Sequence, residues 1–126
     1  MPGRILVVDD DPEMRDLFRE ILTLDAHDVL TAAALEEALA LHPAEPPQVI
    51  LVDAGLAEGA DVVALGGALR KRWPQGEVVY LADMSVPATK HRLERGRIRH
   101  FARPFQVEEL RDLVTGLLKR QTLTGR

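Results

Sequence analysis

The stretch Ile5-Leu6-Val7-Val8-Asp9-Asp10-Asp11-Pro12 decides the fold. Four apolar residues in a row, most of them β-branched, predict a strand buried on both faces, as in a parallel sheet covered by helices. Three carboxylates and a proline then lead into a helix, with Asp11 as the N-cap and Pro12 at the first helical position. The sequence therefore predicts an acidic group at the end of a buried strand.

The composition indicates one globular domain. The chain has 126 residues, 46% of them hydrophobic and 29% charged, which is enough for a single core. We expect the domain to cover residues 1–120 and residues 121–126 to form a polar tail or the start of a linker. The sequence has no cysteine, so disulfides and thiol chemistry are excluded. Its net charge of -4 argues against direct binding of nucleic acid. No apolar run is long enough to span a membrane, and we expect a cytoplasmic protein.

Strand and helix patterns alternate along the whole chain. Further strands are predicted over residues 27–32, 49–52, 78–81 and 97–102, and helices over residues 12–22, 35–41, 61–73, 87–94 and 107–120. Such alternation specifies βα units and a parallel sheet with helices on both faces. The predicted fold class is α/β, a flavodoxin-like doubly wound (βα)5 domain with a five-stranded parallel sheet in three α/β/α layers.

Two of the predicted helices carry specific expectations. The apolar residues of the helix over 12–22 follow a helical period and should all face the core: Met14, Leu17, Phe18, Ile21 and Leu22. The helix over 61–73 contains Gly66 and Gly67, and each glycine costs about 1 kcal/mol relative to alanine. We therefore expect this helix to be weak or to approach the sheet closely.

The strand over 49–52 also ends in an aspartate, Asp53. Ligands of doubly wound sheets bind beyond the carboxyl ends of the strands, where Asp9, Asp10 and Asp53 are expected to meet. Two carboxylates about 4 Å apart repel by about 4 kcal/mol at an effective dielectric constant near 20. Mg²⁺ offsets such repulsion, and a carboxylate beside it can act as a nucleophile on phosphorus. The alternative is that these residues are only helix caps or solvated loop residues, which we prefer for Asp11.

Three motifs resemble the receiver domain of two-component response regulators. They are the run over residues 5–15, the strand ending in Asp53, and Arg103-Pro104-Phe105 before the final helix, and the likeness extends from about residue 4 to residue 120. The resemblance implies a flavodoxin-like fold in which Asp9 and Asp10 help to bind Mg²⁺. It also implies that Asp53 accepts phosphate from a histidine kinase or a phosphotransfer protein, and that the backbone carbonyl of Gly55 completes the metal site.

The sequence departs from this family where the family contacts phosphate. Ala82 stands where a Thr or Ser hydroxyl usually bonds a phosphoryl oxygen, and a hydrogen bond to a charged group is worth about 1.5–3 kcal/mol. Asp83 adds a further carboxylate that would repel phosphate unless it turns to solvent. Ser85 is a candidate for the missing hydroxyl if the loop is rearranged.

Two further positions differ on the fifth strand. Arg103 replaces the family's lysine and, as a rigid planar fork, is expected to hold Asp53 firmly. The Arg103-Pro104 peptide should be cis if the resemblance holds. His100 takes the place of the aromatic switch residue, although an ordinary, partly buried histidine is the simpler interpretation. We expect Mg²⁺ binding to be retained better than phosphate-dependent switching.

Residues 90–103 are rich in basic side chains and contain one acid, Glu94. The functional interpretation is a surface for an acidic partner, a homodimer or an output protein, formed by Lys90, Arg92, Arg95 and Arg99. The alternative is that these are solvated positions on a short helix and an edge strand, where charge discourages edge pairing.

Three functions fit these patterns. The first is a receiver that is not an enzyme beyond its own phosphorylation and dephosphorylation, and whose switching is weakened. The second is a pseudo-receiver, a protein-binding module that acts independently of phosphorylation. The third is a phosphatase of the haloacid-dehalogenase type, suggested by Asp9 and Asp11 but disfavoured by Glu13 and by the lack of room for a cap.

Overall fold

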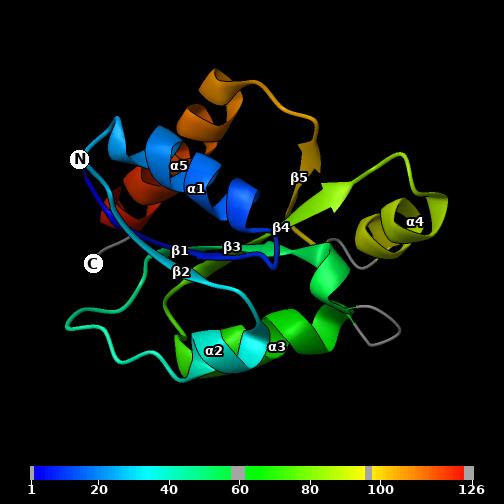
Figure 1. Cartoon of the computed structure of the whole chain (residues 1–126), viewed down its shortest axis with the longest axis horizontal. Helices are drawn as coiled ribbons and strands as arrows, with labels where there is room; N and C mark the ends of the chain where they lie inside the picture. Colours follow the sequence, from blue (N-terminus) through cyan, green and yellow to red (C-terminus); the bar gives the residue numbers. More distant parts are fainter. Residues whose placement is uncertain (1, 58–61, 96–97, 124–126) are drawn as a thin grey trace.

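A five-stranded parallel sheet forms the centre of the computed structural model, which describes residues 2–57, 62–95 and 98–123 (Figure 1). The strands lie in the order β2-β1-β3-β4-β5. Their bounds are β1 Arg4–Val8, β2 Asp28–Ala32, β3 Val49–Asp53, β4 Glu77–Asp83 and β5 His100–Arg103. The order reverses between β1 and β3, so the acidic carboxyl ends of these two strands lie side by side at the switch point.

The helices cover both faces of the sheet. They are α1 Pro12–Thr23, α2 Leu35–Leu39, the short 3-10 helix η1 Ala54–Ala57, α3 Val62–Arg72, α4 Pro87–Arg95 and α5 Val107–Leu123. In Figure 1, α1 and α5 lie on one side of the sheet and α2 and α3 on the other. The predicted three-layer, flavodoxin-like (βα)5 fold is therefore confirmed.

Alternate residues of the strands fill two separate cores. Ile5, Val7, Leu51 and Leu81 pack with α1 and α5, and Leu6, Val8, Val52 and Tyr80 lie in the core with α2 and α3. All of these side chains are at most 1% exposed. The unbroken apolar runs of the sequence thus have their physical cause in a sheet that is covered on both faces.

Helix α1 begins as predicted but does not bury every apolar residue. Asp11 is its N-cap and accepts a hydrogen bond from the Glu13 backbone N–H at 3.0 Å. Leu17, which was expected to face the core, is 41% exposed, and so is Val107 at the start of α5. They line an open groove of about 540 Å³ between α1 and the start of α5. The prediction for Leu17 was wrong because this side of α1 faces the open groove.

Several predicted boundaries also need correction. Helix α2 ends at Leu39 rather than at residue 41, and α4 continues to Arg95. Strand β5 begins at His100, because Ile98 instead donates its backbone N–H to the carbonyl of Leu93 and closes the end of α4. The expected start of this strand at residue 97 lies outside the described residues, as do the expected start of α3 at residue 61 and the end of the tail, residues 124–126.

The final helix is longer than predicted. It reaches Leu123, so the first residues of the expected polar tail are helical. The Gln121 side chain donates to the backbone carbonyl of Gln48 at 2.7 Å and fixes this last turn to the start of β3. Spacing of apolar residues cannot reveal a polar anchor of this kind.

Helix α3 approaches the sheet closely at Gly66, as expected for one of its two glycines. The Tyr80 hydroxyl on β4 donates to the carbonyl of Val62 and lies where a Cβ of residue 66 would be. At Gly67 a Cβ would meet no atom within 4 Å. Only the first glycine is thus required by packing.

No helix within the described ranges is both long and apolar enough to cross a membrane.

Candidate functional site

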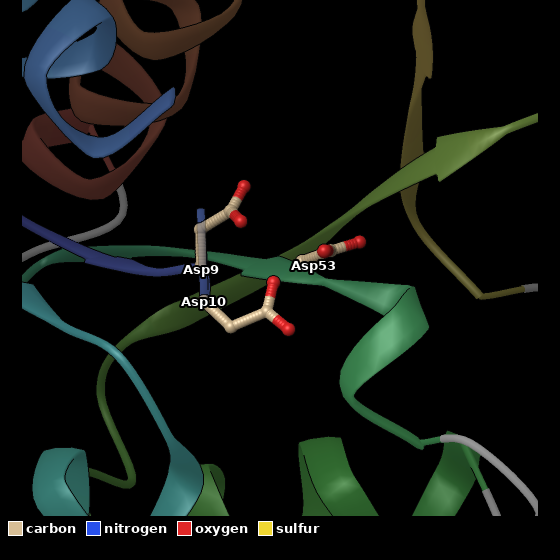
Figure 2. Close-up of side chains that lie close together, drawn as sticks. All are labelled: Asp9, Asp10 and Asp53. Carbon is tan, nitrogen blue, oxygen red and sulfur yellow. The ribbon is translucent and has the colours of Figure 1, made fainter. Parts of the chain in front are cut away.

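Three aspartates meet at the carboxyl edge of the sheet, as predicted. Asp9 and Asp10 follow β1, and Asp53 ends the neighbouring strand β3 (Figure 2). One carboxylate oxygen from each lies within 4.8 Å of the others. Asp11 is instead exposed and committed to the cap of α1. The structure thus separates the three consecutive acids in the way that the sequence suggested.

Asp9 is the buried member of this acidic cluster, which comprises Asp9, Asp10 and Asp53. Its side chain has no solvent exposure, and Oδ1 accepts the backbone N–H of Asp11 at 3.0 Å. Its other oxygen, Oδ2, is buried and has no hydrogen-bond partner among the described residues. Burial raises the pKa of Asp9, and the charges of Asp53 and Asp10 act in the same direction, whereas the Asp11 bond and Arg103 oppose the rise.

Asp53 has two chemically different oxygens. Oδ1 accepts the backbone N–H of Gly55 at 3.0 Å and Nη2 of Arg103 at 2.8 Å. Oδ2 accepts no hydrogen bond from the described part of the chain. Because a carboxylate whose Oδ1 is held by two donors keeps a fixed orientation, Oδ2 is the oxygen that is free to attack a phosphorus atom or to bind a cation.

Arg103 is the cation of the site. Its Nη2 donates a hydrogen bond to Asp53, and its Nη1 lies 3.7 Å from the buried Oδ2 of Asp9. One guanidinium therefore faces both acids. The side chain is 25% exposed. The Arg103-Pro104 peptide is cis, as the resemblance implied. The expectation that Arg103 contacts Asp53 is met, and its second contact with Asp9 was not foreseen.

The positions that distinguish this chain lie at the end of β4. Ala82 is buried and offers no hydroxyl. Asp83 is exposed, and its Oδ1 accepts both the hydroxyl of Ser85 at 2.6 Å and the Ser85 backbone N–H at 3.0 Å. These two bonds, more than the nearby Arg103, lower the pKa of Asp83. The Ser85 hydroxyl is therefore engaged by Asp83, and no hydrogen bond joins Ser85 to Asp53 within the described residues.

His100 and the basic residues have other surroundings than the acidic cluster, of which they are not members. His100 is half-buried, and its Nδ1 donates to the carbonyl of Ile98 at 2.9 Å. Lys90, Arg95 and Arg99 are exposed on α4 and before β5. The side chain of Arg92 falls outside the described part of the structure.

The residues present fit a hard divalent cation. Carboxylate oxygens are the ligands that Mg²⁺ prefers, and within the described part of the chain no group lies at hydrogen-bond distance from the buried Oδ2 of Asp9 to neutralise it. The backbone of Gly55 is held next to Asp53 by the hydrogen bond from its N–H to Oδ1 of Asp53, and the role of its carbonyl as a metal ligand stays a prediction.

Sequence reasoning missed one supporting residue, Arg15. It is half-buried on α1, and its Nη1 donates to the backbone carbonyl of Asp9 at 2.7 Å. This bond fixes the chain between β1 and α1, where the acids are. A signal existed in its position one turn into the helix, from which a long side chain can reach back toward the N-terminus.

Fold and site together define a doubly wound α/β domain with an acidic cluster at its switch point. Residues 5–115 match the response regulator receiver domain family, and the chain belongs to this family. Homologues are response regulators of two-component systems, and the domain class is one of signalling rather than of classical enzymes.

Two relatives illustrate the similarity. The transcriptional regulatory protein KdpE of Mycobacterium tuberculosis is 28% identical over 119 residues, covering 94% of this chain and 52% of KdpE. The response regulator MprA of Mycolicibacterium vanbaalenii is 32% identical over 123 residues, covering 97% of this chain and 53% of MprA. The chain thus spans about half the length of these curated relatives.

Solved structures share the fold. A CheY-like receiver domain protein from Methanospirillum hungatei superposes with a TM-score of 0.81 at 22% identity, covering 99% of this chain and all of that chain. NtrX from Brucella abortus gives a TM-score of 0.80 at 28% identity, covering 98% of this chain and 28% of NtrX.

Proposed function

We propose that this chain accepts a phosphoryl group on Asp53 from a phosphohistidine of a kinase or phosphotransfer protein, with Mg²⁺ bound by Asp9, Asp10, Asp53 and the carbonyl of Gly55. The observation that carries the proposal is the asymmetry of Asp53. Gly55 and Arg103 hold Oδ1, while Oδ2 is left free beside the other acids.

The chemistry follows from this arrangement. Oδ2 of Asp53 forms a bond to phosphorus, and the bond from phosphorus to the histidine nitrogen breaks, with its electron pair leaving on that nitrogen. Bound Mg²⁺ would supply neutralisation of the charge on the phosphoryl oxygens. The protein itself orients the carboxylate through Gly55, and Arg103 offsets the combined charge of Asp53 and Asp9.

Incubation of the full chain with acetyl phosphate and Mg²⁺ tests the proposal. Intact-mass measurement should detect one added phosphoryl group, which Asp53→Asn abolishes while the melting temperature shows that the variant is folded. Asp11→Ala is the matched control, because Asp11 only caps α1 and lies outside the acidic cluster. An unmodified wild type, or equal labelling of Asp53→Asn, would reject the assignment.

A partner surface belongs to the same proposal. The exposed Lys90, Arg95 and Arg99, together with Arg92, suit an acidic partner, either an output protein or a second copy of the chain. Reversing the charge of Lys90, Arg95 and Arg99 should weaken partner binding severalfold and leave labelling by acetyl phosphate intact. Loss of labelling in that variant would contradict the separation of the two sites.

A second candidate function is a binding module that does not depend on phosphorylation. Two observations favour it: Ala82 provides no hydroxyl at the end of β4, and the Arg103 guanidinium already lies 2.8 Å from Asp53 and 3.7 Å from Asp9, where it offsets part of their charge. Asp53→Asn would then leave partner binding unchanged. The phosphatase has no such support, because Asp11, its second required acid, is a solvent-exposed helix cap.

A further inference from the structure

We propose that Arg15 is a positioning residue of the metal site. By holding the backbone carbonyl of Asp9, it fixes the peptide between Asp9 and Asp10 and so directs the Asp10 carboxylate toward the acidic cluster. This inference rests on the proposed binding of Mg²⁺. It adds a residue from outside the cluster, which acts on the metal through the backbone of its ligands.

The first argument is the place of the bond. Nη1 of the half-buried Arg15 donates to the Asp9 carbonyl at 2.7 Å, and this carbonyl belongs to the peptide that joins the two acids. The side chains of Asp9 and Asp10 leave the chain on opposite sides, and both carboxylates turn toward Asp53 (Figure 2). A rotation of the peptide would therefore change the direction of one carboxylate relative to the other.

Asp10 depends on this peptide more than Asp9 does. Asp9 is also held at its backbone N–H, which donates to the carbonyl of Ala32 at 3.0 Å, and at Oδ1, which accepts the Asp11 N–H. The side chain of Asp10 is exposed and forms no hydrogen bond with the described residues. Its direction is therefore set by the backbone that carries it, and Arg15 bonds this backbone.

The second argument is that helix α1 does not need this bond. Its first turn already has a cap, since Asp11 accepts the Glu13 N–H at 3.0 Å, and the Arg15 N–H donates to the Asp11 carbonyl at 3.0 Å. The guanidinium instead reaches back past the cap to the chain that leaves β1. The bond thus serves the acidic turn rather than the start of the helix.

The third argument is that Arg15 leaves the carboxylates free. It forms no ion pair with an acid in the part of the chain that the structure describes, and its charge is not among those that shift the pKa of Asp9. Arg103, by contrast, bonds Oδ1 of Asp53. A donor that orients the ligands without occupying their oxygens is typical of residues that support metal sites.

Titration of the full chain with Mg²⁺, followed by backbone amide chemical shifts, tests the role of Arg15. We expect Arg15→Met to weaken Mg²⁺ binding about tenfold, at the lower end of the range typical of such supporting residues. Charge alone predicts the opposite sign, because removal of a cation close to the acids should tighten the binding of Mg²⁺. Arg15→Lys should recover part of the lost affinity, because a lysine keeps the charge and a donor on a flexible stem.

Arg19→Met is the matched control. Arg19 lies one turn further along α1 and also bonds a backbone carbonyl, that of Val29 at 3.2 Å. Its loss removes the same charge and a similar bond at another place, so the affinity for Mg²⁺ should stay unchanged.

Asp10→Asn tests the route of the effect. This substitution keeps an oxygen that can bind the metal and removes the charge that Arg15 is proposed to direct. In the Asp10→Asn background, Arg15→Met should therefore weaken Mg²⁺ binding much less than in wild type, since residues that act together give non-additive effects. An undiminished loss would show that Arg15 does not act through Asp10 and would overturn the inference.

Melting temperatures without Mg²⁺ show whether each variant is folded. If Arg15→Met does not fold, Arg15→Gln replaces it, because it removes the same charge and its shorter side chain should not reach the Asp9 carbonyl. Mg²⁺ binding by the neutral variant that equals or exceeds that of wild type would overturn the inference and leave the metal site intact. A lack of Mg²⁺ binding in wild type would overturn the proposed metal site as well.

Discussion

At the scale of single residues, Asp9 carries an unbalanced charge. Its buried Oδ2 has no hydrogen-bond partner in the part of the chain that the structure describes. Burial together with Asp53 and Asp10 raises its pKa, so the ionised form is costly in the metal-free protein. Asp9→Asn keeps an oxygen for the Asp11 backbone N–H and removes that charge. We expect the metal-free variant to be more stable than wild type at pH 7 by roughly 1 kcal/mol, from relief of like-charge repulsion.

The same substitution should abolish stabilisation by Mg²⁺. Thermal unfolding with and without Mg²⁺ separates the two effects, because the metal should raise the melting temperature of wild type and not that of Asp9→Asn. Asp10→Asn is the matched comparison for the stability of the metal-free protein, since Asp10 is exposed and its charge is already solvated. A metal-free Asp9→Asn protein that is less stable than wild type would show that Arg103 already compensates Asp9 fully.

His27 should make stability depend on pH. Its Nδ1 accepts the Gly3 backbone N–H at 2.9 Å, its buried Nε2 has no partner among the described residues, and the residue is 5% exposed. Burial lowers the pKa of His27 below its usual 6.5, against the attraction of Asp25. The unfolded chain therefore binds more protons as the pH falls, and the stabilisation present above pH 6.5 is lost below it, by at most about 1.4 kcal/mol per pH unit.

Urea unfolding between pH 5.5 and pH 8 measures this slope. His27→Asn, which keeps an acceptor for the Gly3 N–H, should flatten it, whereas a variant of the exposed His91 on α4 should keep the slope of wild type. If His27→Asn and wild type lose stability equally on acidification, another group is responsible.

The acidic cluster could be predicted from the sequence, but the contacts of Arg103 could not. Asp9, Asp10 and Asp53 follow buried strands, and parallel strands bring their carboxyl ends to one edge, so topology alone places them together. Whether Arg103 touches one acid or two depends on side-chain rotamers. The contact of Ser85 likewise depends on its side-chain rotamer, because its hydroxyl donates to Asp83, two residues earlier in the chain.

At the scale of elements, the two glycines of α3 provide a matched pair. A Cβ at Gly67 would meet no atom within 4 Å, so Gly67→Ala should stabilise the protein by about 0.5–1 kcal/mol through helix propensity. A Cβ at Gly66 would overlap the Tyr80 hydroxyl, so Gly66→Ala should destabilise it by about 1–3 kcal/mol. Urea denaturation of both variants measures the difference, and equal effects would contradict the close contact of α3 with β4.

Helix α4 depends on one side chain. Leu93 is fully buried, whereas the other described side chains of α4 are exposed or half-buried. Leu93→Ala should cost about 2–4 kcal/mol in the packing of this helix. Hydrogen exchange should therefore accelerate in α4 more than in the sheet. Val114→Ala on α5, a substitution in the opposite core, should instead accelerate exchange throughout, and a uniform effect of Leu93→Ala would mean that α4 unfolds only with the whole domain.

The types of the elements could be predicted because strands that are buried on both faces, such as β1 and β3, require unbroken apolar runs. The burial of individual helix side chains was harder to predict. The periodicity of α1 includes Leu17, but the described neighbouring elements leave it 41% exposed, and the residue lines the groove beside Phe105. Periodicity reports which residues share a side of a helix, and the extent of the covering elements decides how many of them are buried.

At the scale of the whole molecule, the question is how far a change at Asp53 spreads. A signal crosses a domain when an element has two arrangements that the site stabilises unequally. In this chain Ala82 has no hydroxyl that could move toward a phosphoryl group and bond it. His100 is held by a hydrogen bond to the nearby carbonyl of Ile98. We therefore expect weak coupling between the acidic cluster and the basic residues of α4.

Backbone amide chemical shifts, recorded before and after addition of beryllofluoride and Mg²⁺, measure this coupling. Large changes should be confined to the neighbourhood of Asp9, Asp53 and Arg103, and the amides of Lys90 and Arg95 should change little. Asp53→Asn defines the background, because it removes the acceptor and keeps the fold. Changes in α4 as large as those beside Asp53 would contradict weak coupling, since they would require a second arrangement of α4 reached without a hydroxyl at residue 82. Leu93 would then be the first residue to test, because it is the buried contact that such a movement of α4 must break.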